Sequence, residues 1–127
     1  MRSDTRRADQ VDRQAELQLL RELTQQVGSN PLLAQASTGN TSIKLDGILW
    51  IKASGRWMAD AQQNEIFIPL HLAEVHQCLQ RDLDPVERYP GASLETAMHA
   101  LLPHPVVLHV HCVNTIAWAV RSDARAH

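Results

Sequence analysis

Residues 93–114 of the chain read SLETAMHALLPHPVVLHVHCVN, and this stretch decides the fold that we predict. The pattern indicates a helix that carries Glu95 and His99, then a turn marked by two prolines, then a short strand over residues 106–111. The turn would bring Glu95 back toward the strand. We therefore expect the rest of the chain to be organised around this helix–turn–strand unit.

The predicted strand carries two histidines on one face. Because strand side chains alternate between faces, His109 and His111 should point the same way, about 7 Å apart at the backbone. Two imidazoles at that spacing can chelate an ion such as Zn²⁺, and Glu95 could act as a further ligand or as a general base. Simple packing is the alternative for a histidine on a strand, although burying two imidazoles without partners is costly. The pattern alone leaves metal binding and packing both open.

Composition predicts one compact domain, because the chain has 127 residues, of which 44% are hydrophobic and 20% charged. The formal net charge of −2 argues against a general nucleic-acid or membrane-surface binder. The sequence has neither an apolar run of membrane-spanning length nor the apolar core of a signal peptide. Cys78 and Cys112 lack CxxC spacing, which favours reduced thiols and a cytoplasmic location.

Apolar residues recur at helical spacing from about residue 11 to residue 27, and Gly28 is a suitable stop. We predict that residues 1–10 form a flexible segment and that residues 11–127 form the domain. The remaining elements that we predict are a strand over 65–70, a helix that opens at 69–70 and runs to about 80, a loop over 81–92, a helix capped by Ser93, and a helix over 114–121.

Asp46-Gly47 is a strong hairpin signal between two predicted strands, 40–45 and 48–52. Small polar clusters, residues 37–42 and 53–55, flank the outer ends of the hairpin. Those ends lie side by side in an antiparallel pair, so their backbone amides and hydroxyls would gather at one place. Such a cluster suits an anion, although Gly, Ser and Thr also make ordinary turns. The order of elements predicts an α/β domain with helices packed on a mixed or antiparallel sheet.

Four motifs in this order resemble the class II aldolase/adducin family of zinc-dependent sugar-phosphate aldolases. They are Gly39-Asn40-Thr41-Ser42, Lys52-Ala53-Ser54-Gly55, Ser93-x-Glu95-x-x-x-His99 and His109-Val110-His111. The resemblance covers residues from about 15 to 121. The segments PLLAQASTGNTSIK and LWIKASG look most similar to the aldolase heads of aldolase–dehydrogenase fusion proteins.

The resemblance implies a three-layer α/β/α sandwich around a largely antiparallel or mixed sheet, often assembled as a homotetramer. It implies that His109 and His111 are two of three zinc-binding histidines, with zinc or another divalent metal as the cofactor. Glu95 matches the carboxylate that binds or borders the metal and moves the proton. The substrate- and phosphate-binding positions that we predict are Gly39, Asn40, Thr41, Ser54, Gly55 and Ser93.

The activity implied is that of a lyase that cleaves or forms a carbon–carbon bond in a sugar or sugar phosphate. Its ene-diolate intermediate carries negative charge that a Lewis acid stabilises. Epimerases, dehydratases and decarboxylases of the family use the same metal half-site, and this sequence does not separate them. The alternatives are a catalytically inactive, adducin-like or truncated domain for binding and assembly, and a plain oligomeric zinc-binding domain.

The chain departs from the family pattern at two points. Family members carry a third zinc-binding histidine downstream of the His-x-His strand, whereas this sequence ends at His127, so we expect it to represent the N-terminal part of the fold. Leu94 stands where sugar-phosphate aldolases commonly have a second phosphate-binding serine. We also expect exposed apolar surface and, as its consequence, self-association.

Overall fold

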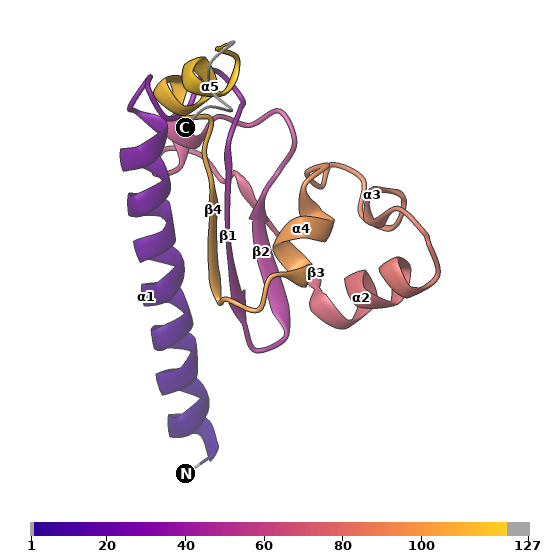
Figure 1. Ribbon diagram of the computed structural model, residues 1–127. Coiled ribbons are helices and arrows are strands. Elements are labelled where there is room, and N and C mark those ends of the chain that lie inside the picture. Colours follow the sequence, from indigo (N-terminus) through magenta and orange to yellow (C-terminus); the bar gives the residue numbers. More distant parts are fainter. Residues whose placement is uncertain (1, 122–127) are drawn as a thin grey trace.

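The computed structural model describes residues 2–121, and the side chains of residues 12–121 (Figure 1). Four strands form one sheet in the order β3-β2-β1-β4, and every pairing is antiparallel. The predicted α/β domain with an antiparallel sheet is therefore confirmed. The strands are β1 Asn40–Leu45, β2 Ile48–Lys52, β3 Phe67–His71 and β4 Val106–His109. The helices are α1 Arg2–Gly28, η1 Met58–Asp60, α2 Leu72–Gln80, α3 Pro85–Arg88, α4 Thr96–Leu101 and α5 Val113–Ala119.

The hairpin of β1 and β2 turns where the sequence predicts. Asp46 and Gly47 both have positive φ angles, 50° and 79°, as a type I′ turn requires. Strand β4 pairs with the other side of β1, and this register places Asn40 directly opposite His109. The start of β1 and the end of β4 are therefore neighbours, which brings two of the motifs together.

Helices cover both faces of the sheet, and each face has its own apolar cluster (Figure 1). On one face, Leu20 of α1 packs with Ile43 and Phe67 of the sheet. On the other, Leu49 and Ile51 pack against α2 and α4. The alternation of β2 side chains produces this division, because Trp50 joins the α1 side while its two neighbours face the opposite way. The complete three-layer sandwich of the family stays a prediction.

Several predicted boundaries are wrong. Helix α1 begins at Arg2 rather than near residue 11, since residues 2–10 contain neither Gly nor Pro to interrupt it. Pro69 lies inside β3 and does not open the next helix. An edge strand tolerates proline because the missing N–H can face away from the ladder. Helix α3 lies within the predicted loop; Pro85 occupies its first turn, and the Asp84 side chain accepts a hydrogen bond from the Val86 amide.

The unit predicted to organise the fold is present, with shifted limits. Helix α4 begins at Thr96, so Glu95 precedes it and Ser93 is not its N-cap. Strand β4 ends at His109, and His111 follows it. His127 lies outside the described residues, and the proposed domain limits of 11–127 stay a prediction. Within the described part of the chain, no helix is both long enough and apolar enough to cross a membrane.

Candidate metal and anion site

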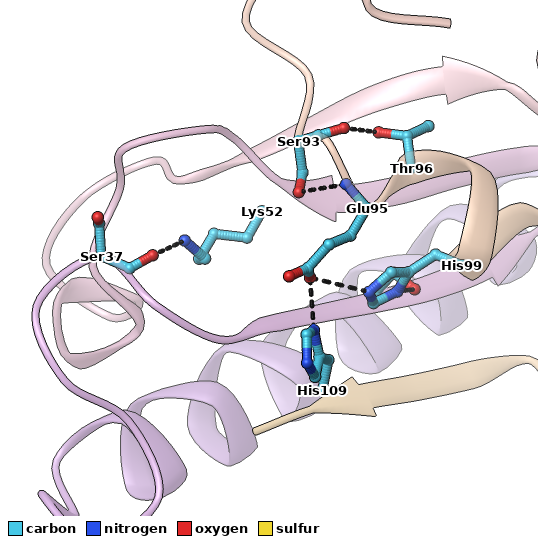
Figure 2. Close-up of polar contacts among 8 residues, drawn as sticks. Ser37, Lys52, Ser93, Glu95, Thr96, His99 and His109 are labelled. Atoms are coloured by element: carbon cyan, nitrogen blue, oxygen red, sulfur yellow. Dashed lines mark hydrogen bonds and ion pairs between the residues drawn. The ribbon is translucent and has the colours of Figure 1, made fainter. Parts of the chain in front are cut away.

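A tight turn before α4 fixes the position of Glu95. The Ser93 hydroxyl accepts a hydrogen bond from the Glu95 amide at 3.1 Å, and the Ser93 carbonyl accepts one from the Thr96 hydroxyl at 2.6 Å (Figure 2). Ser93 and Thr96 are both buried. The Ser93 side chain therefore bonds the residue before the helix rather than the first turn of the helix, and it fixes the backbone of Glu95.

The loop before β1 lies against the end of β4. Gly39 has a φ of 82°, and a Cβ atom added there would lie 2.7 Å from Met58 Sδ and 3.2 Å from the His109 carbonyl oxygen. The backbone angle favours glycine at this position, and the space beside the His109 carbonyl is tight. Beyond β4, the His111 amide donates a hydrogen bond of 2.7 Å to the Leu33 carbonyl, so this segment is also anchored.

Glu95, His109 and His111 converge at the end of β4. The Nδ1 atom of His109 lies 2.7 Å from Oε2 of Glu95, and the two histidine rings are 5.0 Å apart between centroids (Figure 2 shows the first contact). The potential ligand atoms of the three residues all lie within 4.8 Å of one another. The structure thus brings together the three residues to which we assigned metal chemistry.

These three residues fit a divalent metal ion. Oε2 of Glu95 and Nδ1 of His109 are buried, yet neither has a hydrogen-bond partner of normal geometry among the described residues. Buried polar atoms without partners are rare and call for an explanation, which an ion between them would provide. One carboxylate and two imidazoles are ligands that zinc accepts, and three protein ligands plus an open position is the usual catalytic arrangement. The alternative is an ion pair between Glu95 and a protonated His109.

A cavity of about 240 Å³ adjoins this cluster, between the two polar loops. Five of the six residues predicted to bind substrate line it, together with Glu95 and His111. Its lining comprises Ser37, Thr38, Gly39, Asn40, Lys52, Ser54, Gly55, Ser93, Leu94, Glu95 and His111. The two loops therefore meet at one place, as the hairpin predicts. A larger cavity of about 390 Å³ lies along α2 and α3 and includes none of these residues.

Thr41, the sixth predicted residue, is placed elsewhere. Its side chain is fully buried, and its hydroxyl lies 2.6 Å from the Thr24 hydroxyl of α1. Strand alternation explains the difference, because Asn40 and Ser42 share one face of β1 and Thr41 takes the other. The structure gives Thr41 a packing position between sheet and helix, not a position in the cavity.

Lys52 is a residue of the cavity to which the sequence analysis assigned no role. It is only 2% exposed, and its Nζ donates hydrogen bonds to the carbonyls of Ser37 at 3.1 Å and Arg56 at 2.5 Å. It thereby connects the two loops. Burial lowers the pKa of Lys52, while the charge of Glu95 acts in the opposite direction. The position of Lys52 at the end of an apolar strand was a signal that it could be buried. Spacing alone, however, does not reveal that a lysine at a strand end is buried.

His99 lies behind Glu95 and is completely buried. Its Nδ1 is 2.6 Å from the Ser42 hydroxyl, and its Nε2 is 3.9 Å from Oε2 of Glu95. Burial lowers the pKa of His99 to about 4, although the charge of Glu95 opposes the shift. His99 is therefore a neutral imidazole near pH 7, adjacent to the carboxylate. The sequence analysis left its role open between packing and support of Glu95.

Comparisons with known proteins identify the family and the fold of this chain. Residues 18–126 match the family described as Class II Aldolase and Adducin N-terminal domain. The chain is 28% identical over 130 residues to the "Uncharacterized oxidoreductase YuxG" of Bacillus subtilis (strain 168), which covers 85% of this chain and 18% of that protein. Similarity to part of a much longer oxidoreductase agrees with the expected likeness to the aldolase heads of fusion proteins.

Among solved structures, the fold resembles the N-terminal Class II Aldolase domain of a conserved protein from Thermoplasma acidophilum. The TM-score is 0.65 at 22% sequence identity, and the match covers 81% of this chain and 58% of the other. The chain thus spans less than two thirds of both proteins. The family match extends over most of the chain and contains all four motifs, and the chain belongs to the class II aldolase and adducin N-terminal domain family.

Proposed function

We propose that this domain acts as a metal-dependent class II aldolase-type lyase on a hydroxylated, phosphorylated sugar. The observation that carries the proposal is the convergence of Glu95, His109 and His111 beside a polar cavity that contains a buried lysine. Substrate and reaction are inferred from family membership together with the chemistry of these side chains.

In this proposal, His109 and His111 hold a divalent ion such as zinc, and Glu95 binds or borders it. A bound ion would supply Lewis-acid stabilisation for the negative charge of an ene-diolate. Glu95 is the carboxylate placed to take a proton from the substrate and return it. Its side chain is about one-third exposed and lines the cavity, while its backbone is held by Ser93.

The anionic end of the substrate would occupy the cavity between the loops. Lys52 provides the fixed positive charge, and Asn40, Ser54 and Ser93 provide side-chain donors around it. Backbone amides near Gly39 and Gly55 add donors of the kind that bind phosphate. Anchoring one end of the substrate there would hold the reacting carbons beside Glu95 and limit their motion.

Metal content is the first test of this proposal. We expect the purified chain to bind close to one zinc ion, and the His109→Ala/His111→Ala variant to lose it, because two of three ligands are removed. Elemental analysis after dialysis measures this directly. The control is His71→Ala/His104→Ala, which removes two exposed imidazoles away from the cluster. Absence of zinc even after incubation with excess metal would contradict the proposal.

Cleavage activity is the second test. In the zinc-loaded protein, Glu95→Gln should lower the rate of aldol cleavage by about 10²–10⁴-fold, since it removes the proton acceptor and keeps the shape. Product formation from a panel of ketose phosphates, with metal content measured in parallel, separates a chemical defect from metal loss. A Glu95→Gln variant that holds zinc and cleaves at the wild-type rate would contradict the assigned role.

A binding or assembly role without catalysis is the second candidate. The observation that favours it is the exposure of large apolar side chains along the C-terminal third of the described chain, among them Leu94, which is 84% exposed, and Leu101. If the wild-type chain binds zinc but cleaves none of the sugars, this candidate replaces the first.

A further inference from the structure

A buried hydroxyl–imidazole pair lies directly behind Glu95. Ser42 of β1 and His99 of α4 are both fully buried, and their Oγ and Nδ1 atoms are 2.6 Å apart. The other ring nitrogen, Nε2, faces Oε2 of Glu95 at 3.9 Å (Figure 2). Neither Ser42 nor His99 lines the cavity, so neither is placed to touch a substrate there.

The hydrogen-bond inventory of this pair selects one tautomer of His99. A serine hydroxyl has one proton, and a neutral imidazole has one N–H and one acceptor nitrogen. If His99 Nδ1 carried the proton, the Ser42 hydroxyl would need another acceptor, and none is found among the described residues. Nε2 would then turn a lone pair toward a carboxylate oxygen. When Ser42 donates to Nδ1 and Nε2 carries the proton, the hydroxyl has its acceptor, and a buried N–H that still has no hydrogen-bond partner, rather than a lone pair, faces the carboxylate.

With the proton on Nε2, an N–H group faces Oε2 of Glu95, the same oxygen that lies next to His109. Oε2 of Glu95 then lies between two imidazole nitrogens, at 2.7 Å from His109 and 3.9 Å from His99. The longer distance exceeds that of a hydrogen bond, and a movement of the carboxylate by about 1 Å would form one. His99 thus offers Glu95 a second partner besides His109.

We propose that Ser42 and His99 form a positioning relay for Glu95, in which the Ser42 hydroxyl fixes the His99 tautomer and the His99 Nε2–H orients the carboxylate. This inference rests on the proposed function for the role of Glu95, but the tautomer itself does not. Ser42 and His99 are positioning residues, because they act through Glu95.

The neutral state of the ring supports the relay. His99 is fully buried, and burial disfavours a charged ring, so the ring has one proton and must hold it on one nitrogen. Outer-shell hydrogen bonds to ligating groups commonly determine ligand orientation, and their loss costs about 10- to 100-fold in metal affinity or activity. The relay therefore predicts a loss of that size in metal affinity or activity when Glu95 is no longer oriented by His99.

The tautomer can be measured without any activity. Long-range ¹H–¹⁵N correlation spectra of the uniformly ¹⁵N-labelled, metal-free chain distinguish a protonated Nε2 from a protonated Nδ1, and His99→Gln assigns the signals. We expect His99 to be the Nε2–H form, and to lose this preference in Ser42→Ala because the donor to Nδ1 is gone. A protonated Nδ1 in the wild-type protein overturns the relay, and this result uses the variant only to assign the His99 signals.

Zinc affinity then tests the positioning role. We expect His99→Leu to raise the dissociation constant of zinc about 10-fold, and His99→Gln to restore most of the affinity because its amide N–H replaces the ring N–H. Thr24→Val is the matched control, since it removes another buried hydroxyl bonded at 2.6 Å, on the opposite face of the sheet. If Thr24→Val weakens zinc binding as much as His99→Leu does, the effect is structural and the positioning role is wrong.

The two proposals fail in different ways. A wild-type chain that binds no zinc refutes the proposed function, whereas the spectrum still decides the Ser42–His99 tautomer. A chain that binds zinc normally but has Nδ1 protonated refutes only the relay.

Discussion

His99 makes the folding stability of this chain depend on pH. Its pKa is about 4 in the folded protein against an ordinary value of 6.5, so the unfolded state binds more protons between these values. The stabilisation is complete above pH 6.5 and decreases as the pH falls toward 4, by up to about 3 kcal/mol. Urea unfolding of the metal-free protein from pH 7.5 to 4.5 measures the loss. His99→Leu should reduce this slope, and His104→Ala, which removes an exposed histidine, should leave it unchanged.

Lys52 should determine affinity for the anionic end of the ligand. Lys52→Met removes the charge and keeps most of the apolar stem, so we expect the dissociation constant for inorganic phosphate to rise about 10-fold. Phosphate titration followed by ³¹P NMR measures it. Lys44→Met is the control, because Lys44 Nζ bonds the His104 carbonyl, outside the cavity. Equal loss in both variants would show that general charge, and not the position of Lys52, attracts the anion.

The residues that could be predicted are those whose chemistry follows from local spacing. His109 and His111 are two apart, and Asn40 and Ser54 belong to small polar clusters at strand ends. The roles of Thr41 and Lys52 depend on which face packs against α1 and on how two loops close over a side chain. Those contacts join segments distant in sequence, and no local pattern encodes them.

The helices and strands also divide into those that local sequence predicts and those that depend on tertiary contacts. The hairpin was predictable because Asp46-Gly47 specifies its turn. Helix α1 was predictable because its apolar residues recur at helical spacing over many residues. The boundary between β3 and α2 was not, because Pro69 suits both the first turn of a helix and an edge strand. Only the pairing of Pro69 with Trp50 of β2 decides between them, and that pairing is tertiary.

Gly28 allows helix α1 to pack closely against the short helix η1. Helix α1 ends at Gly28, as the sequence predicts. Gly28 has no positive φ, and the reason for glycine is space, because an added Cβ would lie 2.5 Å from backbone atoms of Met58 and Ala59. We expect Gly28→Ala to lower the free energy of unfolding by about 1–3 kcal/mol through this overlap. Thermal unfolding measures the loss. Ser29→Ala is the control at the exposed neighbouring position, and an equal loss there would contradict the packing explanation.

At the scale of the molecule, the strand order of the described residues places one sheet edge beside apolar surface. Strand β4 lies at the end of the sheet order and pairs with β1 alone within the described part of the chain. Val106 and Leu108 on this strand are 45% and 42% exposed. A narrow cleft next to Val106 is lined by Leu19 and Leu23 of α1. An unpaired strand edge next to apolar side chains is a surface on which chains associate.

We therefore expect the chain to self-associate through the β4 edge at micromolar concentration. Replacing Val106 and Leu108 together with lysine should shift the population toward monomer, since charges on an edge strand oppose pairing and apolar burial. Sedimentation velocity over a concentration series measures the shift. Leu83→Lys, which adds a charge at an exposed leucine beside α3, is the control and should leave association unchanged. A wild-type chain that sediments as a monomer at all concentrations would contradict the expectation. Association that persists in the double variant would instead place the contact on another surface, such as the exposed side of α5.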